Sequence, residues 1–271
     1  MSREPLVVLL ADLHSGSSVA PGVEYTDEDG TRHGLSVTRL ALNAFLDQAL
    51  IDTKAAAKGC DIVLGLGGDL IDGDRHHGTH QTYGDVEEQR AWAVELLQPW
   101  ADVAARGLGL KGTDAHVGAN GVMDRSVCQA LGFEVRQFWR ARVGGKILDW
   151  AHHTSGSRRP WLAAGPAVAL ANKTYYEYLE RGEERPAFIA RHHMHYPIHA
   201  MAKDIQVAVA PGWQAQTDYS YRLDPNGLLD VGLLWWWPLR DKVEIKKYPW
   251  PAAAVEEINL AEPKRKARAA A

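Results

Sequence analysis

Cysteine is nearly absent from this chain: Cys60 and Cys128 are the only two among 271 residues. Two thiols cannot build a framework of disulfides, which excludes the small disulfide-stabilised secreted proteins. Both stand in apolar surroundings, so we interpret them as reduced core residues. That usage is typical of a reducing compartment, and we expect a cytoplasmic protein.

The chain also lacks a positive net charge and a long apolar run. Its formal net charge of -4 at pH 7 gives no global basic field that would attract nucleic acid or an anionic membrane. The apolar stretch within residues 1–14 is too short for a signal peptide or a membrane span, so no membrane partner is expected. Residues 251–271 hold the one concentrated basic run. We interpret them as a solvated flexible tail, with a weak tether to nucleic acid as the alternative.

What is present predicts one layered α/β domain over residues 1–250. Hydrophobic residues make up 46% and charged residues 24%, as in an ordinary well-cored protein. Residues 5–12 and 60–69 are continuous apolar runs, which favours strands covered on both faces by further layers. Ser36 and Asp85 are predicted to begin helices. The chain from residue 204 onward is rich in predicted strands.

Carboxylates and imidazoles gather where the predicted strands end. The groups are Asp12 with His14, Asp69 with Asp72, Asp114 with His116, His152 with His153, and finally His192, His193 and His195. In open α/β sheets, ligands bind at the C-terminal edge of the strands. Residues two apart in extended chain point to the same side, so a pair such as Asp12 and His14 can hold one ion together.

This mixture of ligand types indicates a metal centre. Carboxylate with imidazole suits borderline divalent ions such as Mn, Fe, Ni or Zn, of which we favour Mn. Because the set needs no thiolate, a structural zinc finger is not its use. Six or more ligands exceed the needs of one tetrahedral ion, so two divalent ions are the natural number.

The ordered motifs resemble those of the calcineurin-like metallophosphoesterase superfamily. The series comprises D-x-H at residues 12–14, G-D-x-x-D at 68–72, a glycine-led motif at 112–116, a lone strand-end His, and H-x-H at 193–195. The resemblance implies a four-layer α/β/β/α sandwich with two mixed central sheets. It also implies a dinuclear metal site where the sheets meet, with the β-rich end of the chain completing the second sheet.

The resemblance further implies how the ligands divide. It assigns one ion to Asp12, His14 and His195, the other to His152 and His193, and places Asp69 between the two. His153 is the alternative to His152. Asp72, Thr113, His153 and His192 are further candidates for ligands or for side chains that support them.

The third motif departs from the family pattern. The family has Gly-Asn-His, where Asn binds the second metal and His assists catalysis, but this chain has Gly-Thr-Asp-Ala-His at residues 112–116. Two interpretations stay open: Asp114 replaces the amide oxygen, or His116 serves as ligand or general acid. His192 also stands where the family has Gly, and nothing in the sequence explains it.

We therefore expect a phosphoester hydrolase that uses two metal ions and a metal-bound hydroxide. His116 is expected to protonate the leaving group, and Arg158 with Arg159 to hold a substrate phosphate. A phosphodiesterase, nuclease activity included, is preferred over a phosphomonoesterase, with a nucleotide or nucleic acid as a candidate substrate. The alternative is a metal-binding but catalytically weak interaction protein, which the altered third motif would explain. The oligomeric state is not predicted.

Other conspicuous residues receive structural interpretations. The histidines in residues 76–80 are interpreted as a solvated or substrate-facing loop. In the run from Trp235 to Trp237, alternation along a strand would send the outer two rings to one face and Trp236 to the other. That pattern favours core packing over stacking on nucleic-acid bases.

Overall fold

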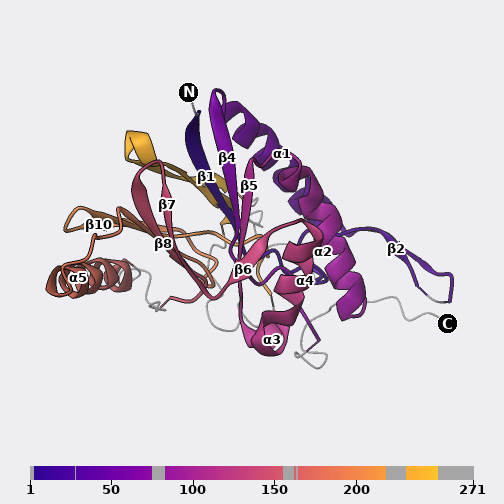
Figure 1. The fold of residues 1–271 in the computed structure, drawn as a ribbon. Helices are drawn as coiled ribbons and strands as arrows, with labels where there is room; N and C mark the ends of the chain where they lie inside the picture. Colours follow the sequence, from indigo (N-terminus) through magenta and orange to yellow (C-terminus); the bar gives the residue numbers. More distant parts are fainter. Residues whose placement is uncertain are drawn as a thin grey trace, which may run out of the picture.

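A computed structural model gives the fold and describes residues 3–27, 29–74, 83–154, 162, 164–217 and 230–249 (Figure 1). The expected phosphate-binding residues Arg158 and Arg159, the histidines of residues 76–80 and the tail at 251–271 lie outside this part of the chain. Among the described residues, no helix combines the length and the apolar character that crossing a membrane requires.

The first sheet has six strands in the order β13-β12-β1-β4-β5-β6. Its members are β1 (Glu4–Leu10), β4 (Cys60–Leu66), β5 (Arg106–Leu110), β6 (Glu134–Arg136), β12 (Val231–Trp237) and β13 (Lys242–Tyr248). Strands β1, β4, β5 and β6 run parallel, whereas β12 pairs antiparallel with β1. The carboxyl ends of β1, β4 and β5 therefore reach the same edge of the sheet.

The second sheet has five strands in the order β10-β11-β9-β8-β7. Its members are β7 (Phe138–Val143), β8 (Lys146–Ala151), β9 (Phe188–Arg191), β10 (Ile198–Ala202) and β11 (Ile205–Val209). Strands β7 and β8 form an antiparallel hairpin through Gly144 and Gly145, which both have positive φ. Strands β8, β9 and β11 are parallel.

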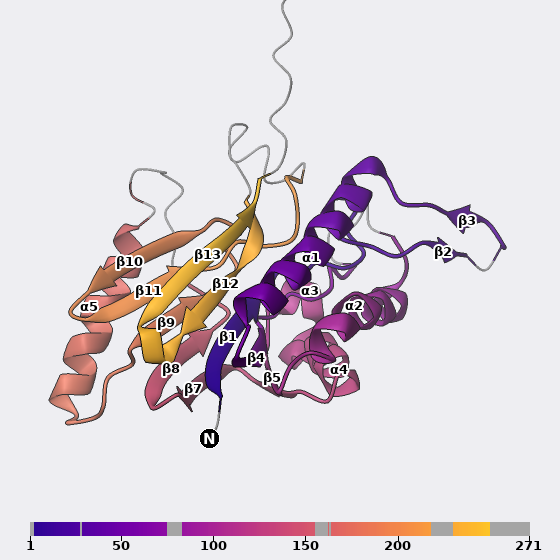
Figure 2. The same ribbon diagram turned by 90° about the horizontal axis from the view of Figure 1, so that it is seen from above.

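Three buried apolar layers separate four layers of secondary structure. The first lies between the six-stranded sheet and the helices α1 (Val37–Ala56), α2 (Val86–Ala101) and α4 (Val122–Ala130). The second lies between the sheets, and the third between the five-stranded sheet and α5 (Gly165–Glu180). Both views show α5 on the far side of the sheets from α1 and α2 (Figures 1 and 2). The expected α/β/β/α sandwich with two mixed sheets is thus confirmed.

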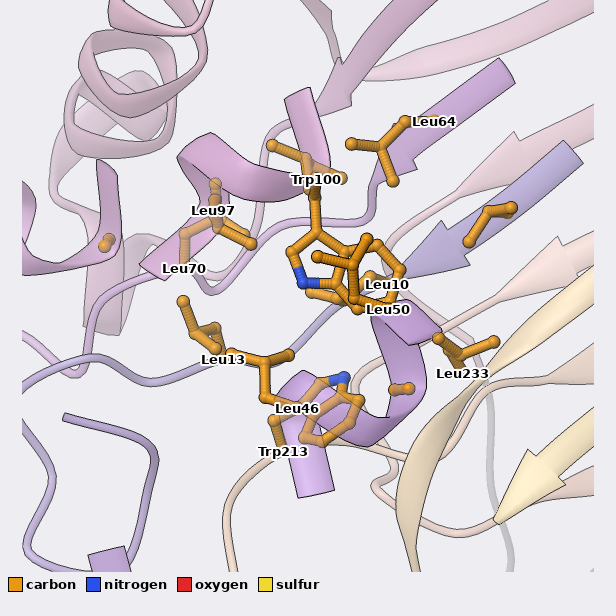
Figure 3. Close-up of a cluster of buried hydrophobic side chains, with 14 of the residues drawn as sticks. Leu10, Leu13, Leu46, Leu50, Leu64, Leu70, Leu97, Trp100, Trp213 and Leu233 are labelled. Atoms are coloured by element: carbon orange, nitrogen blue, oxygen red, sulfur yellow. The ribbon is translucent and has the colours of Figure 1, made fainter. Parts of the chain in front are cut away.

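Alternation along single strands explains the layering. In β1, Leu6, Val8 and Leu10 face the helices, whereas Val7 and Leu9 face the second sheet. In β12, Trp235 and Trp237 join the helix-side core and Trp236 joins the core between the sheets, so the packing interpretation is confirmed. Figure 3 shows the helix-side core, where Trp100 and Trp213 lie among leucines from β1, α1 and α2.

The helix beginnings follow the sequence. The Ser36 hydroxyl accepts a hydrogen bond from the backbone N of Arg39 at the start of α1. At the start of α2, the Asp85 side chain accepts from the backbone N of Glu88, and the Glu88 side chain accepts in return from the backbone N of Asp85. These reciprocal bonds satisfy backbone donors that a helix terminus otherwise leaves without partners.

Some expectations were wrong. The β-rich end of the chain does not complete the second sheet as a whole: β11 joins that sheet, but β12 and β13 extend the first sheet beside β1. Between β1 and α1 the chain forms a two-stranded arm, β2 (Tyr25–Thr26) and β3 (Arg32–His33), which projects from the body of the molecule (Figure 2). Rings of Tyr25 and His33 stack on this arm, 4.5 Å between centroids.

Candidate metal centre

The first predicted ligand group is assembled from chain segments far apart in sequence. Asp12 and His14 follow β1, and His195 follows β9. His14 Nε2 lies 3.3 Å from His195 Nε2, and His195 Nε2 lies 3.6 Å from Asp12 Oδ1. All three side chains are buried or nearly so. Their ligand atoms are close enough to share one ion.

The second group forms around Asp69, which follows β4. Its Oδ2 lies 3.1 Å from His152 Nε2 and 3.9 Å from His193 Nδ1. Ligand atoms of Asp12, Asp69 and His152 also lie within 4.8 Å of one another. The Asp69 carboxylate therefore sits between the two groups. All six predicted ligands are brought to one place.

The backbone is unusual at five of these six residues, which adopt positive φ. The φ angles are 54° at Asp12, 48° at His14, 51° at Asp69, 75° at His193 and 56° at His195. Such conformations cost roughly 1–3 kcal/mol each outside glycine and persist where the surroundings enforce them. Backbone strain at this one set of polar residues indicates a functional site, since it lowers the stability of the fold.

Neighbouring glycines allow the ligands to lie so close to the backbone. A Cβ on Gly112 would lie 2.2 Å from Asp69 Oδ1. A Cβ on Gly212 would lie 2.9 Å from His195 Nδ1. A larger residue at either position would have to displace a ligand.

Hydrogen bonds on the outer side of the site fix the two buried imidazoles. His14 Nδ1 lies 3.1 Å from Asp72 Oδ1, which also accepts a bond of 3.1 Å from Gln214 Nε2. His152 Nδ1 donates to the carbonyl oxygen of Gly67 at 2.7 Å. Both rings are thereby held with Nε2 toward the other ligands, as metal-binding histidines commonly are. Asp72 therefore lies between the His14 ring and Gln214.

Charges within the site shift the ionisation of both histidines. Burial alone would lower the pKa of His152, but the Asp69 carboxylate outweighs it and raises that pKa to about 9. Burial also works against protonation of His14, yet Asp72 and the other carboxylates raise its pKa overall. The site is therefore strongly attractive to positive charge.

Asp124 supports the site from α4, and the sequence analysis did not select it. Its fully buried carboxylate accepts hydrogen bonds from the backbone N of Asp69 (3.2 Å), Leu70 (3.0 Å) and Gly112 (2.7 Å). Burial and the nearby Asp69 charge raise its pKa to about 7. Asp124 precedes the buried Val127 and Cys128 by three and four residues. A carboxylate on the apolar face of a helix is the signal that could have identified it.

The third motif divides between the site and the surface. Thr113 Oγ1 lies 3.3 Å from His152 Nε2 and 3.2 Å from His193 Nδ1, so its hydroxyl stands beside the second group. Asp114 instead pairs with Lys111 at 2.8 Å and is exposed. The reason is local: the helical turn α3 (Asp114–Val117) begins directly after Thr113.

His116 lies next to the first group. Its Nδ1 donates to the carbonyl oxygen of Asp72 at 2.8 Å, and its ring meets that of His14 edge-on with centroids 4.5 Å apart. Burial and the neighbouring His14 lower the pKa of His116 to about 4.

His192 is explained by packing. Its ring is fully buried, and Nε2 accepts a hydrogen bond of 2.7 Å from Trp150 Nε1. Because Nε2 accepts, the proton of the neutral ring is on Nδ1. A Cβ on Gly67 would lie 2.5 Å from Nε2, so the ring fills space beside that glycine. His192 thus anchors the loop that carries His193 and His195.

The site fits divalent cations on its own chemistry. Within the described part of the chain, the buried Asp12 Oδ1 has no hydrogen-bond partner, and burial raises the pKa of this carboxyl. Leaving a buried carboxylate oxygen without a partner is costly unless a cation binds it. Imidazole nitrogens and carboxylate oxygens from six residues converge around this oxygen and Asp69.

Comparison with known proteins yields structural likenesses only. No protein-family model matches the chain, and no curated protein matches it. An archaeal phosphodiesterase is 6% identical with a TM-score of 0.47, covering 90% of this chain and 99% of that one. Vps29 of Entamoeba histolytica complexed with zinc is 13% identical, TM-score 0.41, covering 90% and 98%. A predicted phosphoesterase of Streptococcus pneumoniae is 11% identical, TM-score 0.34, covering 87% and 84%.

At such identities and scores, a likeness carries no inference about activity. The side chains of this chain decide what the site can do. The three likenesses cover most of this chain, but they say nothing about the roles of Thr113, His153 or His192.

Proposed function

We propose that the protein is a metal-dependent hydrolase of phosphoester bonds that binds two divalent ions. The observation that carries this proposal is the position of Asp69, whose buried carboxylate lies between two groups of ligands. Asp12, His14 and His195 would hold one ion, and His152 with His193 the other. A carboxylate shared by two ions is the arrangement of two-metal hydrolytic sites.

The chemistry follows from this arrangement. Bound divalent ions would supply Lewis acidity, which lowers the pKa of water toward neutrality and offsets negative charge on phosphate oxygens. The protein's part is to fix the ligands, and the bonds from Asp72 to His14 and from Gly67 to His152 do so. No serine or cysteine nucleophile is required.

Proton transfer would fall to His116. Its Nδ1 donates to the Asp72 carbonyl oxygen, which fixes the ring beside the first group. With a pKa of about 4, the ring is neutral at pH 7 and would accept a proton before it could donate one. A ring with this low pKa is a weak base, which favours a role in orienting water over the protonation of the leaving group expected from the sequence.

Two synthetic esters test the proposal. The purified protein with Mn is expected to hydrolyse bis-p-nitrophenyl phosphate faster than p-nitrophenyl phosphate, since a diester is the preferred substrate class. Asp69→Asn should abolish both activities. Activity that survives this substitution, or that persists after complete metal removal, would contradict the proposal. Degradation of DNA or RNA by the wild type, abolished in Asp69→Asn, would show that the protein is a nuclease.

A second function is favoured by one observation. Asp114 is turned to the surface toward Lys111, so the third motif contributes only the Thr113 hydroxyl to the second group. A metal-binding interaction protein with weak catalysis fits that loss. Two bound ions without hydrolysis of either ester would support this second function instead.

A further inference from the structure

The second ligand group contains one more imidazole than the resemblance requires. Ligand nitrogens of His152, His153 and His193 all lie within 4.8 Å of one another. The His153 ring meets His152 edge-on at 4.9 Å and His193 at 5.2 Å between centroids. Although adjacent in sequence, His152 and His153 therefore approach the same place.

The oxygen ligands available to this group are weak. Thr113 offers a neutral hydroxyl, 3.3 Å from His152 Nε2 and 3.2 Å from His193 Nδ1. Asp69 approaches His152 most closely, and an oxygen of Asp12 also lies within 4.8 Å of ligand atoms of Asp69 and His152. Asp12 Oδ1 is in addition 3.6 Å from His195 Nε2 in the first group. The two groups thus have carboxylates in common, and the second differs from the first in that its own members are three imidazoles.

We propose that His153 is a third imidazole ligand of the second position, which makes that position select an ion of the zinc class over manganese. Nitrogen ligands suit zinc, nickel and copper, whereas oxygen-rich sites suit manganese and magnesium. The first position, with Asp12 and the shared Asp69, accepts manganese. The two positions therefore hold different metals when both are supplied. This inference rests on the metal centre of the proposed function.

The exposure of His153 makes the inference testable. His153 is exposed, while His152 is buried and tied to Gly67. Removal of the exposed ring leaves the core untouched, so His153→Ala is expected to fold. His199→Ala is the matched control. His199 is also exposed and lies in β10, but its Nε2 contacts Gln206 at 3.2 Å and not the ligand group.

The experiment measures binding, not turnover. Zinc chloride and manganese chloride are titrated by calorimetry into metal-free wild type, His153→Ala and His199→Ala. His153→Ala should lose at least ~10-fold in zinc affinity at one of two sites and keep its manganese affinity. His199→Ala should match wild type. Crystals grown with both metals should show the zinc anomalous signal beside His152 and the manganese signal beside Asp12.

The outcomes separate this inference from the proposed function. Unchanged zinc affinity in His153→Ala, or a zinc signal confined to the Asp12 position, would overturn the role of His153 while the hydrolase proposal stands. Wild type that binds neither metal would overturn both. A circular dichroism spectrum equal to that of wild type confirms that His153→Ala has folded, so a lost affinity reports the missing ligand.

Discussion

His14 Nε2 and His195 Nε2 lie 3.3 Å apart across 181 positions of sequence. The Nδ1 of His14 is already directed at Asp72 Oδ1, so Nε2 is the atom that His14 presents to the site. Two ring nitrogens at this distance cannot both carry a proton toward each other. A cation between them would use a lone pair from each ring and also satisfy the buried Asp12 Oδ1.

Divalent metal should therefore stabilise the fold. A ligand that binds only the native state at 100 times its Kd adds about 2.7 kcal/mol to the free energy of unfolding. For a chain of this size, we expect Mn or Zn to raise Tm by several degrees. Thermal unfolding followed by circular dichroism, before and after dialysis against a chelator, measures the shift. An identical Tm in both states would contradict a metal site built from these six residues.

Asp124→Asn is expected to destabilise the protein by about 1–3 kcal/mol, because an amide cannot accept from three backbone N–H groups as the carboxylate does. The substitution should also lower the metal affinity, since the backbone N of Asp69 is one of the three donors. Urea denaturation provides the free energy of unfolding. Asp114→Asn is the matched control, because it removes only an exposed ion pair. Equal effects of the two substitutions would refute the supporting role of Asp124.

Which candidate ligands would meet in the fold was easier to predict from the sequence than which residues support them. Each ligand follows a strand with a clear apolar pattern, and parallel strands must bring their carboxyl ends to one edge. Asp124 follows no such rule: its importance comes from three backbone donors that only the folded loops place around it. Positive φ at the ligands is likewise a product of the assembled site and is not encoded in their residue types.

The layers of the fold were predictable from local apolar patterns, but the sheet that each strand joins was not. Runs such as residues 5–12 indicate a strand covered on both faces, and the layers follow. Local pattern does not tell which sheet a strand joins. Strands β12 and β13 joined the first sheet because Trp235 and Trp237 complete its helix-side core while Trp236 packs between the sheets.

Gly112→Ala should weaken metal binding strongly and also lower the free energy of unfolding. The added Cβ would lie 2.2 Å from Asp69 Oδ1 and 2.3 Å from the Asp69 backbone N, so both the carboxylate and the loop that carries it must move. We expect at least a ~10-fold loss in affinity for the first ion bound, measured by calorimetry. Gly165→Ala is a suitable control, since a Cβ there meets nothing within 4 Å and the residue begins α5. Wild-type affinity in Gly112→Ala would show that Asp69 does not hold the ions.

His192→Ala tests whether this ring packs or ligates. The substitution removes a fully buried ring and leaves Trp150 Nε1 without its acceptor, which should cost about 3 kcal/mol of unfolding free energy. His192→Gln retains an acceptor of similar reach and should recover part of that loss. Metal stoichiometry should stay at two in both variants, because His192 Nε2 accepts from the indole and His192 belongs to none of the ligand groups found among the described residues. A variant that loses one ion at unchanged stability would instead assign His192 to the metal centre.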